Sequence, residues 1–168
     1  MNHVPIPAAS TELASLPHLV FKACAQGDID FSVVYGSMSA SVYADCVWDP
    51  FPDLLRWLEA ITTGVQCCAF EWDACGPDFA FKFQRSDQTI GHVEVVKNID
   101  LLLGSFLAPT RHIVEGFYRS FIEFTASAGY VPEEWQEESG SWFGQDLRRL
   151  CSPRIEAWLS NCAGSVGE

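Results

Sequence analysis

The feature that most constrains this chain is the alternation of large apolar residues with small or polar ones in residues 68–73 and 79–84. Glycine, proline and aspartate lie between the two segments, at residues 76–78, and these residue types favour a turn. The large apolar positions are Cys68, Phe70 and Trp72 in the first segment and Phe79, Phe81 and Phe83 in the second. Because alternate residues of a strand point to opposite faces, the pattern predicts a β-hairpin with one buried face and one face in water.

Four other segments are predicted to be strands, from their apolar and β-branched residues and from the turn residues between them. These strands are residues 31–36, 40–48, 90–97 and 101–107. In the third of them, Val93 and Val95 are expected to point inward. Tight turns connect most of these strands to their neighbours, so we expect antiparallel pairing.

Two amphipathic segments predict helices. Asp49 can cap the first helix and Gly64 can end it in a left-handed conformation, whereas Thr110 can cap the second. The apolar residues at helical spacing are Phe51, Leu54, Leu55, Leu58 and Ile61 in the first, and Ile113, Val114, Phe117, Phe121 and Phe124 in the second. Trp57 and Phe117 are therefore expected to lie inside, where they link both helices to the sheet.

The predicted order is ββ-α-ββββ-α-α, which describes an α+β fold with an antiparallel sheet of about six strands and helices packed on one face. Residues 1–28 are expected to form a partly ordered N-terminal arm with a short helix over residues 17–25. Residues 29–168 then make a single domain that includes a C-terminal helical tail, broken at Pro153.

The longest apolar runs, such as Leu101–Leu103, are too short to cross a bilayer. The first 17 residues lack the basic region of a secretory signal and are interrupted by Pro5 and Pro7. A cytoplasmic protein that does not enter the membrane is therefore expected.

The seven cysteines are odd in number and irregular in spacing, which argues against a secreted disulfide framework. Cys67, Cys68 and Cys75, together with His92 on a neighbouring strand, are of the residue types that bind zinc. Adjacent residues of a strand point to opposite faces, so Cys67 and Cys68 should not converge on one ion. Buried thiols are therefore the favoured interpretation, and no metal is expected.

The sequence contains none of the glycine-rich loops that hold nucleotides and no nucleophile elbow, so no cofactor is expected. Glu71 and Asp73 share a predicted strand face, and Lys82 is expected on the same face across the hairpin. Pairing of opposite charges across the strands explains these residues without catalysis. The sequence therefore predicts no catalytic residues, although a small enzyme without a recognisable motif remains an alternative.

Charge is the strongest indication of a partner. The chain has 22 acidic and 10 basic residues and a formal net charge of −12. Nucleic acid would be repelled by such a surface, because phosphate binding needs lysine and arginine. A basic protein would be attracted and would associate quickly. The alternative is that the charge serves solubility alone.

A pattern in residues 48–124 resembles acidic α+β domains found among the immunity proteins of polymorphic bacterial toxins. The residues that carry it are Asp49-Pro50-Phe51, Leu54-Leu55, Trp57-Leu58-Glu59, Gly64, Ile113-Val114, Phe117-Tyr118 and Phe124. Most of these residues belong to the predicted core and helix ends, so the resemblance implies a fold more directly than a function.

The sequence thus predicts a non-enzymatic binding protein, an immunity protein that neutralises a basic bacterial toxin. An uncharacterised small enzyme or an assembly subunit is the alternative, and the oligomeric state is left open. Aromatic residues among acids are typical of tight interfaces. On that basis the predicted binding residues are Asp45, Trp48, Glu71, Trp72, Asp73, Glu133, Glu134 and Trp135.

Overall fold

The computed structural model describes residues 15–25, 28–44, 51–72, 78–130 and 151–164 of the 168-residue chain. Its strands form two antiparallel sheets, one of three strands and one of four. The first sheet contains β1 (His18–Ala25), β2 (Asp28–Tyr35) and β3 (Met38–Ala44). The second contains β4 (Cys67–Trp72), β5 (Phe79–Arg85), β6 (Ile90–Lys97) and β7 (Leu101–Pro109). The helices are α1 (Phe51–Thr62), α2 (Thr110–Thr125) and α4 (Pro153–Gly164). The predicted α+β class is confirmed.

The predicted hairpin forms the first two strands of the second sheet. β4 pairs with β5 in the register expected from the alternation, with Cys68 opposite Phe83, Phe70 opposite Phe81 and Trp72 opposite Phe79. β5 pairs in turn with β6, where Val93 and Val95 are fully buried as predicted. The strands follow one another in the order β4-β5-β6-β7, so β4 and β7 are the edges of this sheet.

The N-terminal prediction was wrong in one element. Residues 17–25 were expected to form a short helix, but residues 18–25 form strand β1, which pairs with β2 along its length. The order of elements from β1 to β7 is therefore βββ-α-ββββ. The structure has seven strands in two sheets, whereas about six strands in one sheet were predicted. The first sheet begins at His18, which lies inside the segment that was predicted to be an arm.

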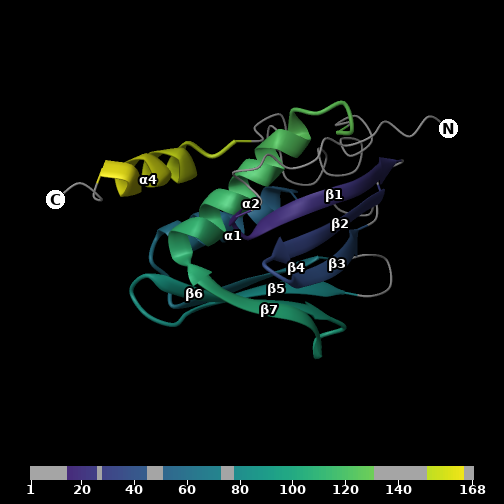
Figure 1. The fold of residues 1–168 in the computed structure, drawn as a ribbon, viewed down its shortest axis with the longest axis horizontal. Coiled ribbons are helices and arrows are strands. Elements are labelled where there is room, and N and C mark those ends of the chain that lie inside the picture. Colours follow the sequence, from purple (N-terminus) through teal and green to yellow (C-terminus); the bar gives the residue numbers. More distant parts are fainter. Residues whose placement is uncertain (1–14, 26–27, 45–50, 73–77, 131–150, 165–168) are drawn as a thin grey trace.

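Both sheets and two helices surround one core of aromatic rings. In Figure 1, α1 and α2 lie above the β4–β7 sheet, beside the β1–β3 sheet, and no helix lies beneath β4–β7. Trp57 of α1 packs 5.4 Å from Phe70, and Phe117 of α2 packs 6.4 Å from Phe81, measured between ring centroids. Both residues are buried as predicted, and the indole Nε1 of Trp57 also donates to the carbonyl of Cys68 at 3.4 Å. The core therefore fixes the inner face of β4–β7, and no described helix lies over its outer face.

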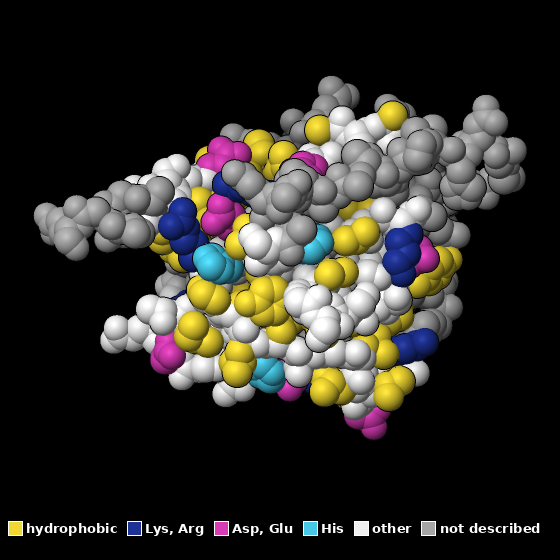
Figure 2. Space-filling view, viewed as in Figure 1, with side chains coloured by type: hydrophobic (Ala, Val, Ile, Leu, Met, Phe, Trp, Pro, Cys, Tyr) yellow, Lys and Arg dark blue, Asp and Glu magenta, His cyan; other side chains and the backbone are white. Residues whose placement is uncertain are grey.

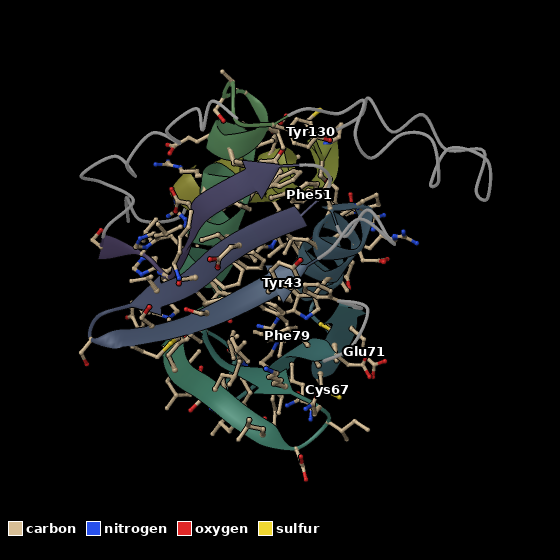
Figure 3. All side chains as sticks on the ribbon, turned by 90° about the vertical axis from the view of Figure 1, so that its right-hand side faces the viewer. Tyr43, Phe51, Cys67, Glu71, Phe79 and Tyr130 are labelled. Atoms are coloured by element: carbon tan, nitrogen blue, oxygen red, sulfur yellow. The ribbon has the colours of Figure 1, made fainter. Side chains whose placement is uncertain are left out.

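The ends of the helices agree only partly with expectation. Gly64 follows α1 with a φ of +85°, the left-handed conformation predicted for it. Thr110 does not cap α2: it is the first helical residue, and its hydroxyl is buried without a hydrogen bond among the described residues. Asp49 lies outside the described residues. At the upper end of the core, the rings of Phe51 and Tyr130 meet at 5.7 Å (Figure 3).

Helix α4 is joined to α1 and α2 by a group of polar contacts. Ser152 precedes α4, and its hydroxyl accepts from the amide of Ile155, as an N-cap does. The same hydroxyl donates to a carboxylate oxygen of Glu59 on α1. The Tyr118 hydroxyl on α2 donates to Glu156 at 2.8 Å and accepts from the amide of Ser152 at 2.9 Å. The pKa of Tyr118 is well above its ordinary value, and burial of the hydroxyl is the largest cause.

No helix among the described residues is long and apolar enough to cross a membrane.

Candidate functional site

The outer face of the β4–β7 sheet is the candidate site, because no described helix covers it (Figure 1). Its side chains form a grid that the strand register fixes. One row runs from β4 to β7 and contains Cys67, Gln84, His92 and Leu107. The next row contains Ala69, Lys82, Glu94 and Ser105. The face is thus polar on its central strands and becomes apolar towards β7.

A pocket of about 330 Å³ lies on this face, above β4, β5 and β6. Its lining residues are Cys67, Cys68, Ala69, Lys82, Phe83, Gln84, His92 and Glu94. Lys82 and Glu94 are direct cross-strand neighbours, yet no ion pair joins them among the described residues. The side chains of Gln84 and His92 likewise make no hydrogen bond to the described part of the chain. These four groups are therefore available to an external polar partner.

Large apolar side chains are exposed along β7 and at the tip of the β6–β7 hairpin. Leu107 is 59% exposed and lies beside His92 at the border of the pocket, while Leu101 and Leu102 are 53% and 52% exposed. Ile99, at the tip, is 79% exposed. Figure 2 shows hydrophobic side chains along the lower part of the molecule, over β7 and this tip. Such a surface has the mixture of apolar and polar groups that protein interfaces use.

The hairpin tip also stores backbone strain. Asn98 and Ile99 have φ values of 51° and 74°, in the left-handed region. Asparagine tolerates this region, but a β-branched residue rarely adopts it and is held there at a cost of roughly 1–3 kcal/mol. The strain places the apolar side chain of Ile99 in solvent next to Leu101. Strained backbone of this kind clusters at functional sites.

Neither thiol of the described part of this sheet has a hydrogen-bonded base among the described residues. Cys67 and His92 both pair with Gln84 from opposite sides, so their backbones lie two strand spacings apart, roughly 9–10 Å. A thiol and its base need hydrogen-bond contact, and no hydrogen bond joins Cys67 to His92 in the described part of the chain. Cys68 points inward, and burial raises the pKa of its thiol to about 11, with Cys67 adding to the rise and Arg85 opposing it. A thiol with such a pKa is almost entirely protonated at neutral pH and is a weak nucleophile.

Of the candidate zinc ligands, the described ones do not converge. Cys67 and His92 lie on the outer face, and Cys68 faces the opposite side as the strand period predicts. Cys75 lies outside the described residues. Among the residues that the structure describes, no group of three or more His, Cys, Asp or Glu side chains is arranged to hold a metal ion.

Of the predicted binding residues, only Glu71 can be placed in full. It is exposed on β4, on the same strand as Cys67 at the lower side of the molecule (Figure 3). Lys82 lies across the hairpin on the same face as Glu71, as predicted, with Ala69 directly opposite it. Trp72 is the last residue of β4 and its side chain is not described. Those outside the described residues are Asp45, Trp48, Asp73, Glu133, Glu134 and Trp135.

Sequence reasoning missed the exposed leucines of β7. Leu102 and Leu107 belong to a strand with apolar residues on both faces, and such a strand is usually buried on both faces. Three successive leucines at residues 101–103 were the available signal, but only the position of β7 at the sheet edge reveals that they are exposed.

The acidic excess is unevenly distributed along the chain. Of the 22 acids and 10 bases, the described residues contain 12 acids and 8 bases. The remaining segments therefore contain 10 acids and 2 bases. Among them, residues 45–50 precede α1, residues 73–77 connect β4 to β5, and residues 131–150 precede α4. The residues outside the described ranges thus contribute a net charge of −8 to the total of −12.

Comparison of the chain with family models, with curated protein sequences and with solved structures finds no match.

Proposed function

We propose that this chain is a non-enzymatic binding domain that captures a basic protein on the outer face of the β4–β7 sheet. The observation that carries the proposal is the open sheet face, where the unpartnered polar groups of the pocket adjoin the exposed Leu102 and Leu107. An apolar contact surrounded by polar groups gives both burial and specificity in protein interfaces.

Charge supports a basic partner over a neutral or acidic one. Glu71 and Glu94 lie on the face itself, and Asp73 follows directly after β4 in the sequence. The net charge of −12 would accelerate the approach of a cationic protein and slow that of an acidic one. In the two rows of outward-facing residues, Lys82 is the only lysine or arginine, and it lies opposite Glu94.

The specific form of the proposal is an immunity-type protein that acts in the bacterial cytoplasm and neutralises a basic toxin. Its support is the residue pattern in residues 48–124 together with the acidity of the chain. Inhibitors of this kind need high affinity and no catalytic group, which agrees with a face that lacks a nucleophile and base in contact. An enzyme and an assembly subunit are the alternatives that the test below separates.

The proposal is tested by affinity capture from the source organism, with identification of the captured protein by mass spectrometry. We expect a protein with a basic isoelectric point. The purified partner is then measured against Glu71→Lys, with Glu123→Lys on the exposed side of α2 as the control for net charge. Glu71→Lys should lower the affinity roughly tenfold, whereas Glu123→Lys should cause a much smaller change.

The apolar contact is tested in the same assay by Leu102→Ser, which should raise the dissociation rate more than it lowers the association rate. Capture of only acidic or neutral proteins would contradict the proposal, as would equal effects of Glu71→Lys and Glu123→Lys. Turnover of a small molecule by the purified chain would favour the enzyme alternative.

A further inference from the structure

Strand β7 is an open sheet edge without a single charged side chain. Its sequence is LLLGSFLAP, and it forms one edge of the four-stranded sheet. Sheet edges are usually protected from pairing with other chains by lysine, proline or a bulge. In β7 the register with β6 shifts at Leu103, near one end of the strand, and Pro109 lies at the other end. Residues 104–108 between them pair regularly with β6 and carry no such protection.

The hydrogen-bond pattern shows which backbone groups of β7 point to the free edge. The amide of Thr110 donates to the carbonyl of Thr89 at 2.7 Å, and these two residues continue the register of β6 and β7. In an antiparallel ladder, bonded and non-bonded pairs alternate, so Ala108, Phe106 and Gly104 also face β6. Ser105 and Leu107 therefore direct their N–H and C=O groups away from β6. Pro109, which has no N–H, falls on the same side, as the pattern requires.

One side of this edge is already occupied. A Cβ atom at Gly104 would lie 2.8 Å from the sulfur of Met38 and 3.3 Å from the Cβ of Ala40, so β3 covers the inner face of β7. In Figure 1, β7 forms the front edge of the lower sheet, and in the same view Figure 2 shows hydrophobic side chains over it. An added strand can therefore approach β7 along its edge and continue the sheet.

We propose that two copies of this chain associate through β7, in an antiparallel pair whose two-fold axis passes beside Phe106. In this register Ser105 of one copy faces Leu107 of the other, and each residue meets the other's free N–H and C=O groups. Side chains of both residues lie on the outer face, so Leu107 would pack beside Ser105 of the second copy along the seam, and the outer face itself would stay open. The result is a continuous sheet of eight strands.

A second copy fits this edge better than a basic peptide does, because the edge is self-complementary and uncharged. Two chains of net charge −12 repel each other over most of their surfaces. The strand that lacks charge is where that repulsion is weakest. Since higher salt screens the repulsion, association of the copies should strengthen as salt rises. Binding of a basic partner should weaken under the same change, so the two proposals can fail separately.

The test is the mass of the full chain in solution by sedimentation equilibrium, over a range of protein and salt concentrations. We expect twice the monomer mass of 18.6 kDa at high concentration, with a dissociation constant that falls as salt rises. Leu107→Lys places a charge on the edge and should weaken the dimer at least tenfold. Gln84→Lys is the matched control, because it adds the same charge to the same face but on a central strand.

Ser105→Pro tests the backbone contacts directly. It removes an N–H that points to the free edge and leaves the bonds between β6 and β7 intact, so the monomer should retain its fold and lose the ability to pair. A mass of 18.6 kDa at every concentration would overturn the proposal. A dimer that persists in both Leu107→Lys and Ser105→Pro would also overturn it.

Discussion

Gly116 shows how a single residue sets the position of a whole strand. It lies on α2 where the helix crosses the chain just before β1, and a Cβ there would be 2.0 Å from the carbonyl oxygen of Pro17. The close approach lets Ser120, one turn later, accept a hydrogen bond from the amide of Leu19 at 3.0 Å. Absence of a side chain at residue 116 therefore allows β1 to pack against α2.

Gly116→Ala should destabilise the protein, because the new methyl group would meet backbone that cannot move without displacing β1. We expect a loss of roughly 1–3 kcal/mol in the free energy of unfolding, measured by urea denaturation. Glu123→Ala, at an exposed position of the same helix, is the control and should change stability much less. Equal effects of the two substitutions would show that the contact with Pro17 is not tight.

Cys67 and Cys68 are neighbours in sequence with opposite environments. Alkylation at mildly alkaline pH should modify the exposed Cys67 well before Cys68, whose pKa is raised to about 11 by burial. Tandem mass spectrometry locates the label, and the unfolded chain, in which both should react, is the control. Equal rates in the folded protein would mean that the faces of β4 are assigned incorrectly.

The same pKa shift has a consequence for stability. Because the folded pKa of Cys68 lies above the ordinary value of 9.0, the folded state disfavours the thiolate. The stabilising effect is complete below pH 9 and is lost as the pH rises through about 11.

Among the elements, α4 depends on few polar contacts for its position. Tyr118→Phe removes the hydroxyl that contacts both Glu156 and the amide of Ser152, and it should cost about 1–2 kcal/mol. Hydrogen exchange should become faster in residues 153–164, while the β4–β7 sheet should remain protected. Arg154→Gln, at an exposed position of α4, is the control. Unchanged exchange in Tyr118→Phe would show that the buried Ile155 and the Ser152–Glu59 hydrogen bond hold the helix without the tyrosine hydroxyl.

The elements that were predicted well from the sequence are those with one buried face and one solvent-exposed face. The β4–β5 hairpin and α2 show clear periods of two and about 3.6 residues, because each has a buried side and an exposed side. Strand β1 was missed because His18, Leu19 and Phe21 are all buried. A short apolar run without alternation cannot be assigned to strand or helix from its own residues.

Prediction of the candidate site was limited for a different reason. Glu71 could be assigned to the solvent-exposed face from the alternation of apolar and polar residues in its own strand. The exposure of Leu102 and Leu107 depends on the order of strands in the sheet, which brings β7 to the edge. Strand order is a long-range property, and no local pattern in residues 101–109 contains it.

At the scale of the whole molecule, the two faces of the β4–β7 sheet differ, because the described helices cover only the inner face. Helices α1 and α2 cover the inner face of β4–β7 and share its aromatic core, while the outer face presents the pocket and the exposed leucines. The formal net charge of the chain is −12, and Glu71 and Glu94 lie on this face. Together these features support capture of a basic protein, brought in by charge and retained by apolar contact.

The most direct test of this account is the association rate constant for the captured partner, measured at low and at high salt. The account predicts that the association rate falls by roughly tenfold or more as salt rises, while the dissociation rate changes much less. An association rate that does not change with salt would contradict it, because the negative charge of the chain would then have no part in recognition.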